Sequence, residues 1–151
     1  MTLTPRRLEK LVSYRERLEH VQEGKLGIAQ RAHQERERTL AETRARRESL
    51  FAAGAPSAGA FEPVDLEGGL AYVGRLDREI AATNAALVHS ANAVNFERNQ
   101  LLNRRRDRKA METLLDKERE AQRRAALRSE QQALDEVALR NWPSIANAKE
   151  I

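Results

Sequence analysis

The chain contains no cysteine, few aromatic residues and no long apolar run. Without cysteine it forms no disulfide bond or thiolate metal site, which fits a reducing compartment. Aromatic residues make up 4% of the sequence and charged residues 33%, a composition that argues against one broad hydrophobic core. No apolar stretch approaches the roughly 20 residues that span a bilayer, and no secretory signal opens the chain. We therefore expect a cytoplasmic protein without direct membrane insertion.

Glycine and proline are also scarce, with 7 and 4 residues, and two of each fall between residues 53 and 63. Elsewhere glutamate, arginine, alanine, leucine and glutamine dominate, which is typical of long helices. The residue before a proline disfavours helical geometry, so Trp142-Pro143 predicts a helix end. We expect a single coiled-coil domain over residues 1–151, with a helix at about 5–52, a loop at about 53–63, a helix at about 64–142 and a tail at 143–151.

Residues that could carry chemistry are not grouped along the chain. The three histidines, His20, His33 and His89, are scattered, and the acidic residues are interleaved with arginine. The glycines between residues 68 and 74 lack the Lys-Ser/Thr ending of a phosphate-binding loop. We therefore expect no catalytic residue, no cofactor, no metal site and no enzymatic activity.

The clearest positive signal is a ladder of branched aliphatic residues at seven-residue intervals in the second half of the chain. Its members are Leu66, Val73, Ile80, Leu87, Val94, Leu101 and, after Arg108, Leu115. Such a recurrence gives an α-helix a narrow apolar seam that only another helix can cover.

A second ladder with alternating steps of three and four residues runs through the first half. Its members are Leu11, Tyr14, Leu18, Val21, Ile28 and Ala32, with Lys25 as the one interruption. Both seams are buried if the chain folds as an all-α, antiparallel two-helix coiled-coil hairpin. The second helix is the longer one, and pairing outward from residue 58 leaves its C-terminal part, from Met111 to Arg140, overhanging.

Basic residues gather at both ends of the chain, with net charges of +4 over residues 1–50, −3 over 51–100 and +3 over 101–151. The densest cluster, residues 104–109, suggests a nucleic-acid binder as one alternative. Acidic residues follow the cluster and no aromatic stacking platform lies near it, so we expect no nucleic-acid partner. A structural coiled coil that dimerises in parallel through Leu66–Leu115 is a second alternative.

Both ends of the chain resemble the flagellar FliJ family. The opening segment, residues 7–17, has the family's basic and leucine residues before an Arg-Glu run, and the end of the second helix has its charged closing run. That closing run matches at Leu134, Asp135, Glu136, Ala138 and Arg140.

The resemblance implies a stalk and general chaperone of the flagellar type III export apparatus. Such proteins are coiled coils whose terminal helices enter the ring of the export ATPase, so the five matching residues are the candidates for facing that ring. The implied partners are the export ATPase and its regulator, the export gate membrane protein and escort chaperones. We expect a monomeric hairpin associated peripherally with the inner-membrane export apparatus. Injectisome stalk proteins share this plan, and the resemblance leaves the choice between the two systems open.

Overall fold

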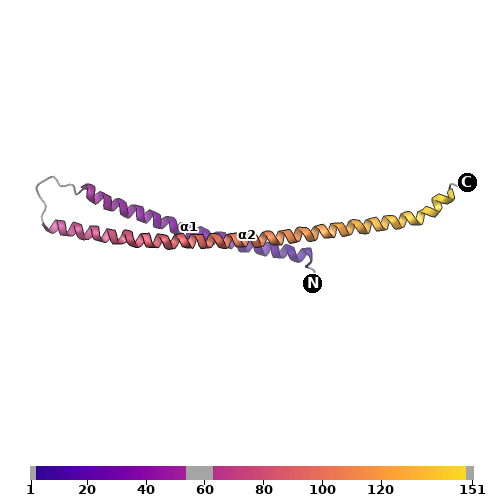
Figure 1. Ribbon diagram of the computed structural model, residues 1–151, viewed down its shortest axis with the longest axis horizontal. Coiled ribbons are helices and arrows are strands. Elements are labelled where there is room, and N and C mark those ends of the chain that lie inside the picture. Colours follow the sequence, from indigo (N-terminus) through magenta and orange to yellow (C-terminus); the bar gives the residue numbers. More distant parts are fainter. Residues whose placement is uncertain (1–2, 54–62, 149–151) are drawn as a thin grey trace. The chain divides into compact units, whose positions relative to one another are not determined.

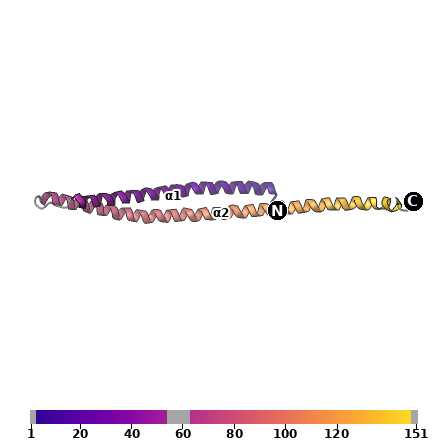
Figure 2. The same cartoon turned by 90° about the horizontal axis from the view of Figure 1, so that it is seen from above.

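Two long helices form the protein. The computed structural model describes residues 3–53 and 63–148, with α1 at Pro5–Ala53 and α2 at Pro63–Ala148. The two helices run in opposite directions and pack against each other as a helical hairpin (Figures 1 and 2). The predicted all-α fold is thus confirmed, while most of the predicted loop, at residues 54–62, lies outside the described residues.

Both helices begin at a proline. The carbonyl oxygen of Thr4 accepts hydrogen bonds from the backbone N–H groups of Arg7 (2.9 Å) and Leu8 (3.1 Å), which closes the first turn of α1. Proline suits the first helical position because no N–H is needed there and its φ angle is already helical. The same residue type opens α2 at Pro63.

The end of α2 differs from the predicted one. The helix continues through Trp142 and Pro143 to Ala148. A proline has no backbone N–H. Inside a helix it therefore leaves the carbonyl oxygen of the residue four positions earlier without its usual hydrogen-bond donor. That residue is Leu139, whose side chain is exposed, so water can reach this part of the helix and solvate the carbonyl.

The chain divides into two compact units, which are described separately. One unit is Leu18–Arg104, and the other combines Met1–Arg17 with Arg105–Ile151. In the first unit Leu40, Leu76, Val94 and Leu101 are buried, and Leu76 is only 2% exposed. These side chains form the apolar part of the contact between α1 and α2 in this unit.

Polar pairs complete the contact in the unit Leu18–Arg104. Gln22 donates through Nε2 to the carbonyl oxygen of Glu97 at 3.2 Å and to the carboxylate of the same residue. His33 Nδ1 lies 2.7 Å from Ser90 Oγ. At the exposed edge Arg47 Nε pairs with Asp77 Oδ1 at 2.6 Å.

The α2 side of this contact follows the predicted ladder, except at its start. Leu66 is exposed, Val73, Ile80 and Leu87 are half-buried, and Val94 and Leu101 are buried. A second series completes the heptad three residues after each of the positions from Val73 to Leu101, and it is covered as well. Its members are Leu76, Thr83, Ser90, Glu97 and Arg104.

The α1 side of the contact lies one residue beyond the predicted seam. Val21, Ile28 and Ala32 are exposed and Leu18 is half-buried, whereas their C-terminal neighbours are covered. Those neighbours are Glu19, Gln22, Ala29 and His33. The physical reason is the polarity of α2, because its Ser90 and Glu97 side chains need polar partners and obtain them from His33 and Gln22.

In the unit formed by Met1–Arg17 and Arg105–Ile151, Leu8 and Leu115 are buried, whereas the predicted seam residues Leu11 and Tyr14 are exposed. Ion pairs join Arg15 to Asp107 at 3.3 Å and Glu9 to Arg119 at 2.8 Å.

The two helices pair further along α2 than the predicted limit near residue 110. Glu9 reaches Arg119, so the overhang begins about nine residues later than predicted. The pairs in the unit Leu18–Arg104 have a shifted register too, since Arg47 lies opposite Asp77. This places the centre of the pairing near residue 62 rather than 58.

Candidate partner-binding surfaces

The C-terminal part of α2 shows no covered side chain as far as its side chains are described, up to residue 142. Every described side chain from residue 120 to residue 142 is exposed, and we call these residues the exposed segment. Its large apolar side chains are Leu127, Leu134, Val137, Leu139 and Trp142. Apolar groups of this size on one stretch of helix are a common feature of surfaces that bind a partner.

Local sequence explains why the exposed segment is helical without such packing. It is rich in alanine, arginine, glutamine, glutamate and leucine, the residues with the highest helix propensity. Glu120 and Arg124 also form an ion pair across one helical turn. From Gly74 to Pro143 no glycine or proline interrupts the helix.

All five predicted ring-facing residues lie in the exposed segment, and they point in different directions. Leu134 and Ala138 share one face of α2 because they lie one turn apart. Glu136 and Arg140 also lie one turn apart, on the opposite face, and Asp135 projects between the two faces. The five residues therefore surround the helix rather than form one patch.

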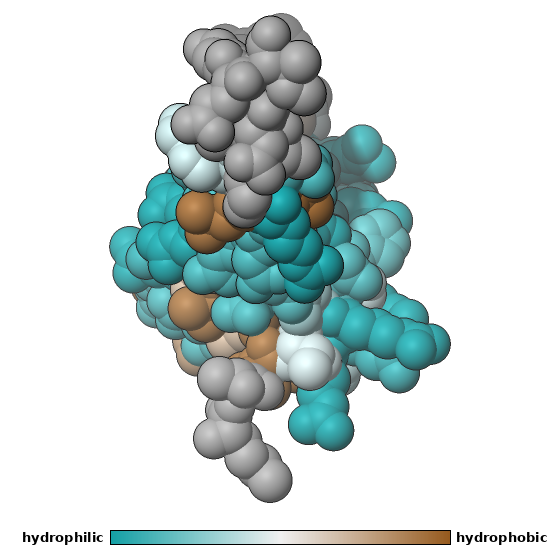
Figure 3. Space-filling view, turned by 90° about the vertical axis from the view of Figure 1, so that its right-hand side faces the viewer, coloured by the Kyte–Doolittle hydropathy of each residue, from teal (hydrophilic) through white to brown (hydrophobic). Residues whose placement is uncertain are grey.

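The surface around the end of α2 is mainly hydrophilic. Figure 3 views the molecule from the side on which α2 ends, and its few hydrophobic groups are separated by hydrophilic ones.

A second surface lies on α2 in the unit Leu18–Arg104, where charged residues are missing. Residues 80–96 contain no Asp, Glu, Lys or Arg, although a third of the whole chain is charged. Helical spacing brings nine exposed residues of this stretch and of the next two turns onto one face that carries no Asp, Glu, Lys or Arg. The members of this uncharged face are Ala81, Asn84, Ala85, Val88, Asn92, Asn95, Phe96, Asn99 and Leu102.

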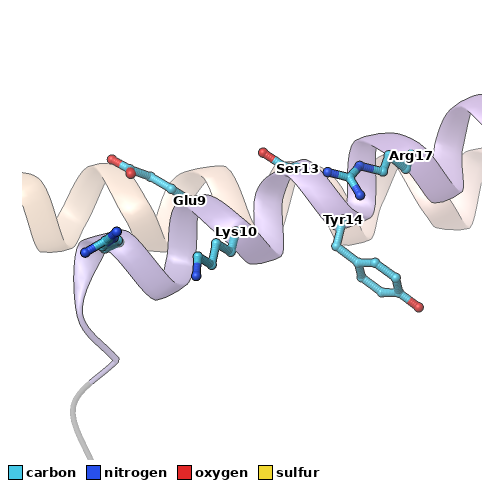
Figure 4. Close-up of a pocket in the computed structure, with 6 residues that line it drawn as sticks. Glu9, Lys10, Ser13, Tyr14 and Arg17 are labelled. Carbon is cyan, nitrogen blue, oxygen red and sulfur yellow. The ribbon is translucent and has the colours of Figure 1, made fainter.

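A third surface is an open hollow of about 550 Å³ on the outer side of α1. Its walls are the side chains of Arg6, Glu9, Lys10, Ser13, Tyr14 and Arg17 (Figure 4). The phenol of Tyr14 extends away from the helix, and Lys10 and Arg17 lie one turn before and after it. The walls carry three cationic side chains and one acidic one, so the hollow has a net positive charge that favours an acidic partner.

Some members of the basic cluster at residues 104–109 already have partners in the hairpin. Asp107 pairs with Arg15, and Arg108 pairs with Glu112 at 2.6 Å. Within the described residues no three His, Cys, Asp or Glu side chains come close enough to hold a metal ion. His33 is the histidine with the most polar contacts, because its Nε2 lies 3.4 Å from Glu37 while Nδ1 faces Ser90.

Two of these three surfaces, the uncharged face of α2 and the hollow on α1, were not predicted from the sequence. The uncharged face could have been found from the absence of charge in residues 80–96, which is visible in the sequence. The hollow on α1 could not, because Tyr14 had been placed in the seam and its exposure depends on how α1 is rotated against α2. No described helix has both the length and the hydropathy that crossing a membrane requires.

Comparison with known proteins gives one match. The family model described as "Flagellar FliJ protein" matches residues 5–144, nearly the whole chain. No curated protein and no solved structure matches. Because the match includes both helices and the exposed segment, this chain belongs to the FliJ family and is a stalk protein of flagellar type III export.

Proposed function

We propose that this chain is a non-enzymatic stalk whose exposed segment docks into the ring of the export ATPase. The observation that carries the proposal is the exposure of every described side chain from residue 120 to residue 142. Covering apolar surface stabilises a complex by about 25 cal/mol per Å². The exposed leucines and Trp142 therefore favour a partner that encloses this helix.

The distribution of the five candidate residues supports an enclosing partner. Leu134 and Ala138 lie on one face and Glu136 and Arg140 on the opposite one, so a flat surface would reach only one of these pairs. A ring contacts a central helix from all sides. This is the arrangement in which all five residues can bind.

A second part of the proposal concerns the export gate membrane protein, for which the uncharged face of α2 is the candidate contact. Exposed helices of a chain this rich in charge normally carry charged residues, and residues 80–96 carry none. Val88 and Phe96 provide exposed apolar anchors there. Uncharged, partly apolar surfaces of this kind resemble the cores of protein interfaces.

On this proposal the protein acts in the cytoplasm at the inner-membrane export apparatus. It is held there by the ATPase and its regulator through one surface and by the gate through another. Handling of escort chaperones is part of the proposed role, and we assign no surface to it. The FliJ family match favours the flagellar system over the injectisome and over a purely structural coiled coil.

Two matched substitutions test both parts at once. Leu134→Asp and Phe96→Asp each place a charge at an exposed apolar position of α2, so neither should disturb the hairpin. We expect Leu134→Asp to weaken ATPase binding by about 2 kcal/mol, or about 30-fold, and to abolish ATPase stimulation. We expect Phe96→Asp to weaken binding to the cytoplasmic domain of the gate protein by a similar factor.

Each variant is the control for the other. ATPase stimulation by Phe96→Asp and gate binding by Leu134→Asp should remain at wild-type levels, with unchanged far-UV circular dichroism. Unaltered ATPase stimulation by Leu134→Asp would overturn the ring assignment. Unaltered gate binding by Phe96→Asp would overturn the gate assignment and leave the ring assignment standing.

A further inference from the structure

The first turns of α1 carry a basic face that the proposed function leaves unused. It consists of Arg6, Arg7, Lys10, Tyr14 and Arg17, which are all exposed and all lie in one compact unit of the chain. Their spacings of three, four and seven residues place them within about 100° of arc around the helix. We call these five residues the basic face.

The two acidic residues of the same turns lie outside the basic face. Glu9 and Glu16 are about 60° or more beyond its edge. Glu9 is also engaged elsewhere, because it pairs with Arg119 of α2 at 2.8 Å. In Figure 4 Lys10 and Tyr14 project to one side of α1 and Glu9 projects to the other. No carboxylate therefore offsets the positive charge within the basic face.

The cationic side chains of the basic face form no ion pair or hydrogen bond with another described residue. The nearby Arg15 differs, because it points towards α2 and pairs with Asp107 at 3.3 Å. Long side chains that extend freely into solvent lose conformational entropy when a rigid partner fixes them. Lipid headgroups diffuse within their layer and can gather around cations that stay mobile. A fluid anionic surface therefore suits the basic face better than a rigid acidic protein surface.

The aromatic member of the basic face fits the same kind of surface. Tyr14 lies between Lys10 and Arg17 along the helix and is 54% exposed. Tyrosine is enriched where a membrane meets water, because its ring is apolar and its hydroxyl group is polar. The basic face has no aliphatic residue that would enter the acyl chains, so it matches the headgroup layer.

We propose that the basic face lies on the surface of a membrane that contains acidic lipids, with its cations at the lipid phosphates and Tyr14 at headgroup level. Each Lys or Arg near such a surface strengthens binding about fivefold, so four of them together strengthen it roughly 600-fold. The contact is peripheral and reversible. It uses α1 alone, so it stands whether or not the exposed segment of α2 binds the ATPase.

Vesicle co-sedimentation of the full chain tests the proposal. Phosphatidylcholine vesicles with about 40% phosphatidylglycerol should bind the chain at an ionic strength of about 0.05 M, and binding should be lost at about 0.5 M or without the acidic lipid. Lys10→Glu with Arg17→Glu should weaken binding at least about 25-fold. Lys25→Glu with Arg31→Glu is the matched control, because it changes the net charge equally at exposed positions outside the basic face. It should weaken binding less than about threefold.

Tryptophan fluorescence locates the contact along α1. In a Trp142→Phe background, Tyr14→Trp supplies the only tryptophan of the chain. Its emission should move to shorter wavelength when the acidic vesicles are added, because the indole ring enters the headgroup layer. Gln34→Trp in the same background is the control, since residue 34 is exposed on α1 outside the basic face, and its emission should not move.

The inference would be overturned by a chain that does not bind the acidic vesicles, or by equal losses of binding in the two double variants. Tighter binding to duplex DNA than to the vesicles would assign the basic face to nucleic acid instead. Loss of ATPase stimulation by Lys10→Glu with Arg17→Glu, with vesicle binding unaltered, would assign it to the ATPase. Leu134→Asp should bind the vesicles like the wild-type chain, so failure of the ring assignment can be distinguished from failure of this one.

Discussion

At the scale of the residue, the contact between α1 and α2 consists of buried leucines and of hydrogen-bonded polar pairs. Leu76 is the most deeply buried large side chain, while Gln22 and Ser90 are buried with hydrogen-bonding partners. Within the part of the chain that the structure describes, no buried side-chain nitrogen or oxygen lacks a partner. Satisfied polar groups at a seam specify which residues face each other, because a rotated helix would leave them unpaired.

Leu76→Ala tests how much stability a single buried leucine supplies. Removing this side chain should lower the free energy of unfolding by about 2–4 kcal/mol, from lost burial and a partly filled cavity. Leu70→Ala is the matched control, since Leu70 lies on the same helix and is 64% exposed, and it should change stability by less than about 0.5 kcal/mol. Urea unfolding followed by circular dichroism measures both, and equal losses would contradict the burial of Leu76.

At the scale of the element, α1 carries two neighbouring stripes with the same period. One stripe contains Val21 and Ile28 and is exposed, and the other contains Gln22 and Ala29 and faces α2. The stripes are offset by one residue, or about 100° around the helix. The exposed stripe is the more apolar one, so apolar side chains remain available there for a partner.

A pair of substitutions on α1 tests which stripe is buried. Leu40→Asp should destabilise the hairpin by more than about 3 kcal/mol, because it places a charge among apolar side chains without a partner. Ile28→Asp should change stability by less than about 1 kcal/mol, because Ile28 is 63% exposed. Thermal and urea unfolding at low micromolar concentration measure this difference. A larger loss for Ile28→Asp than for Leu40→Asp would show that α1 packs through its other stripe.

At the scale of the whole molecule, α2 has a part covered by α1 and a part that is not. Side chains are covered at regular intervals from Val73 to Glu118, and none is covered from residue 120 to residue 142. Helices without tertiary packing have marginal stability, whereas packed helices open only when the fold opens. The two parts of one continuous helix should therefore differ in their dynamics.

Hydrogen exchange measures this difference in the full chain. Backbone amides between residues 73 and 118 should exchange at least about 100-fold more slowly than those between residues 122 and 142. Deleting residues 122–151 should then leave the free energy of unfolding of the hairpin within about 0.5 kcal/mol of its original value. Equal protection along all of α2, or a large loss of stability on deletion, would mean that the exposed segment packs on something within the chain.

The existence and order of the two helices follow from the sequence alone. Helix formers fill both segments, two glycines and two prolines separate them, and the seven-residue ladder from Val73 to Leu115 marks the side of α2 that meets α1. These features are local or periodic, so they can be recognised without knowing what each helix contacts. The resemblance at residues 7–17 and 124–140 likewise led to the FliJ family.

Only the tertiary structure decided how α1 is rotated and how far it reaches. Periodicity favoured the stripe with Val21 and Ile28, yet the hairpin buries the neighbouring one, because Ser90 and Glu97 of α2 take polar partners from α1. The length of the exposed segment also depended on tertiary pairing, since Glu9 reaches Arg119 rather than residue 110. Adjacent stripes share one period, so the partner helix, and not the periodicity itself, selects between them.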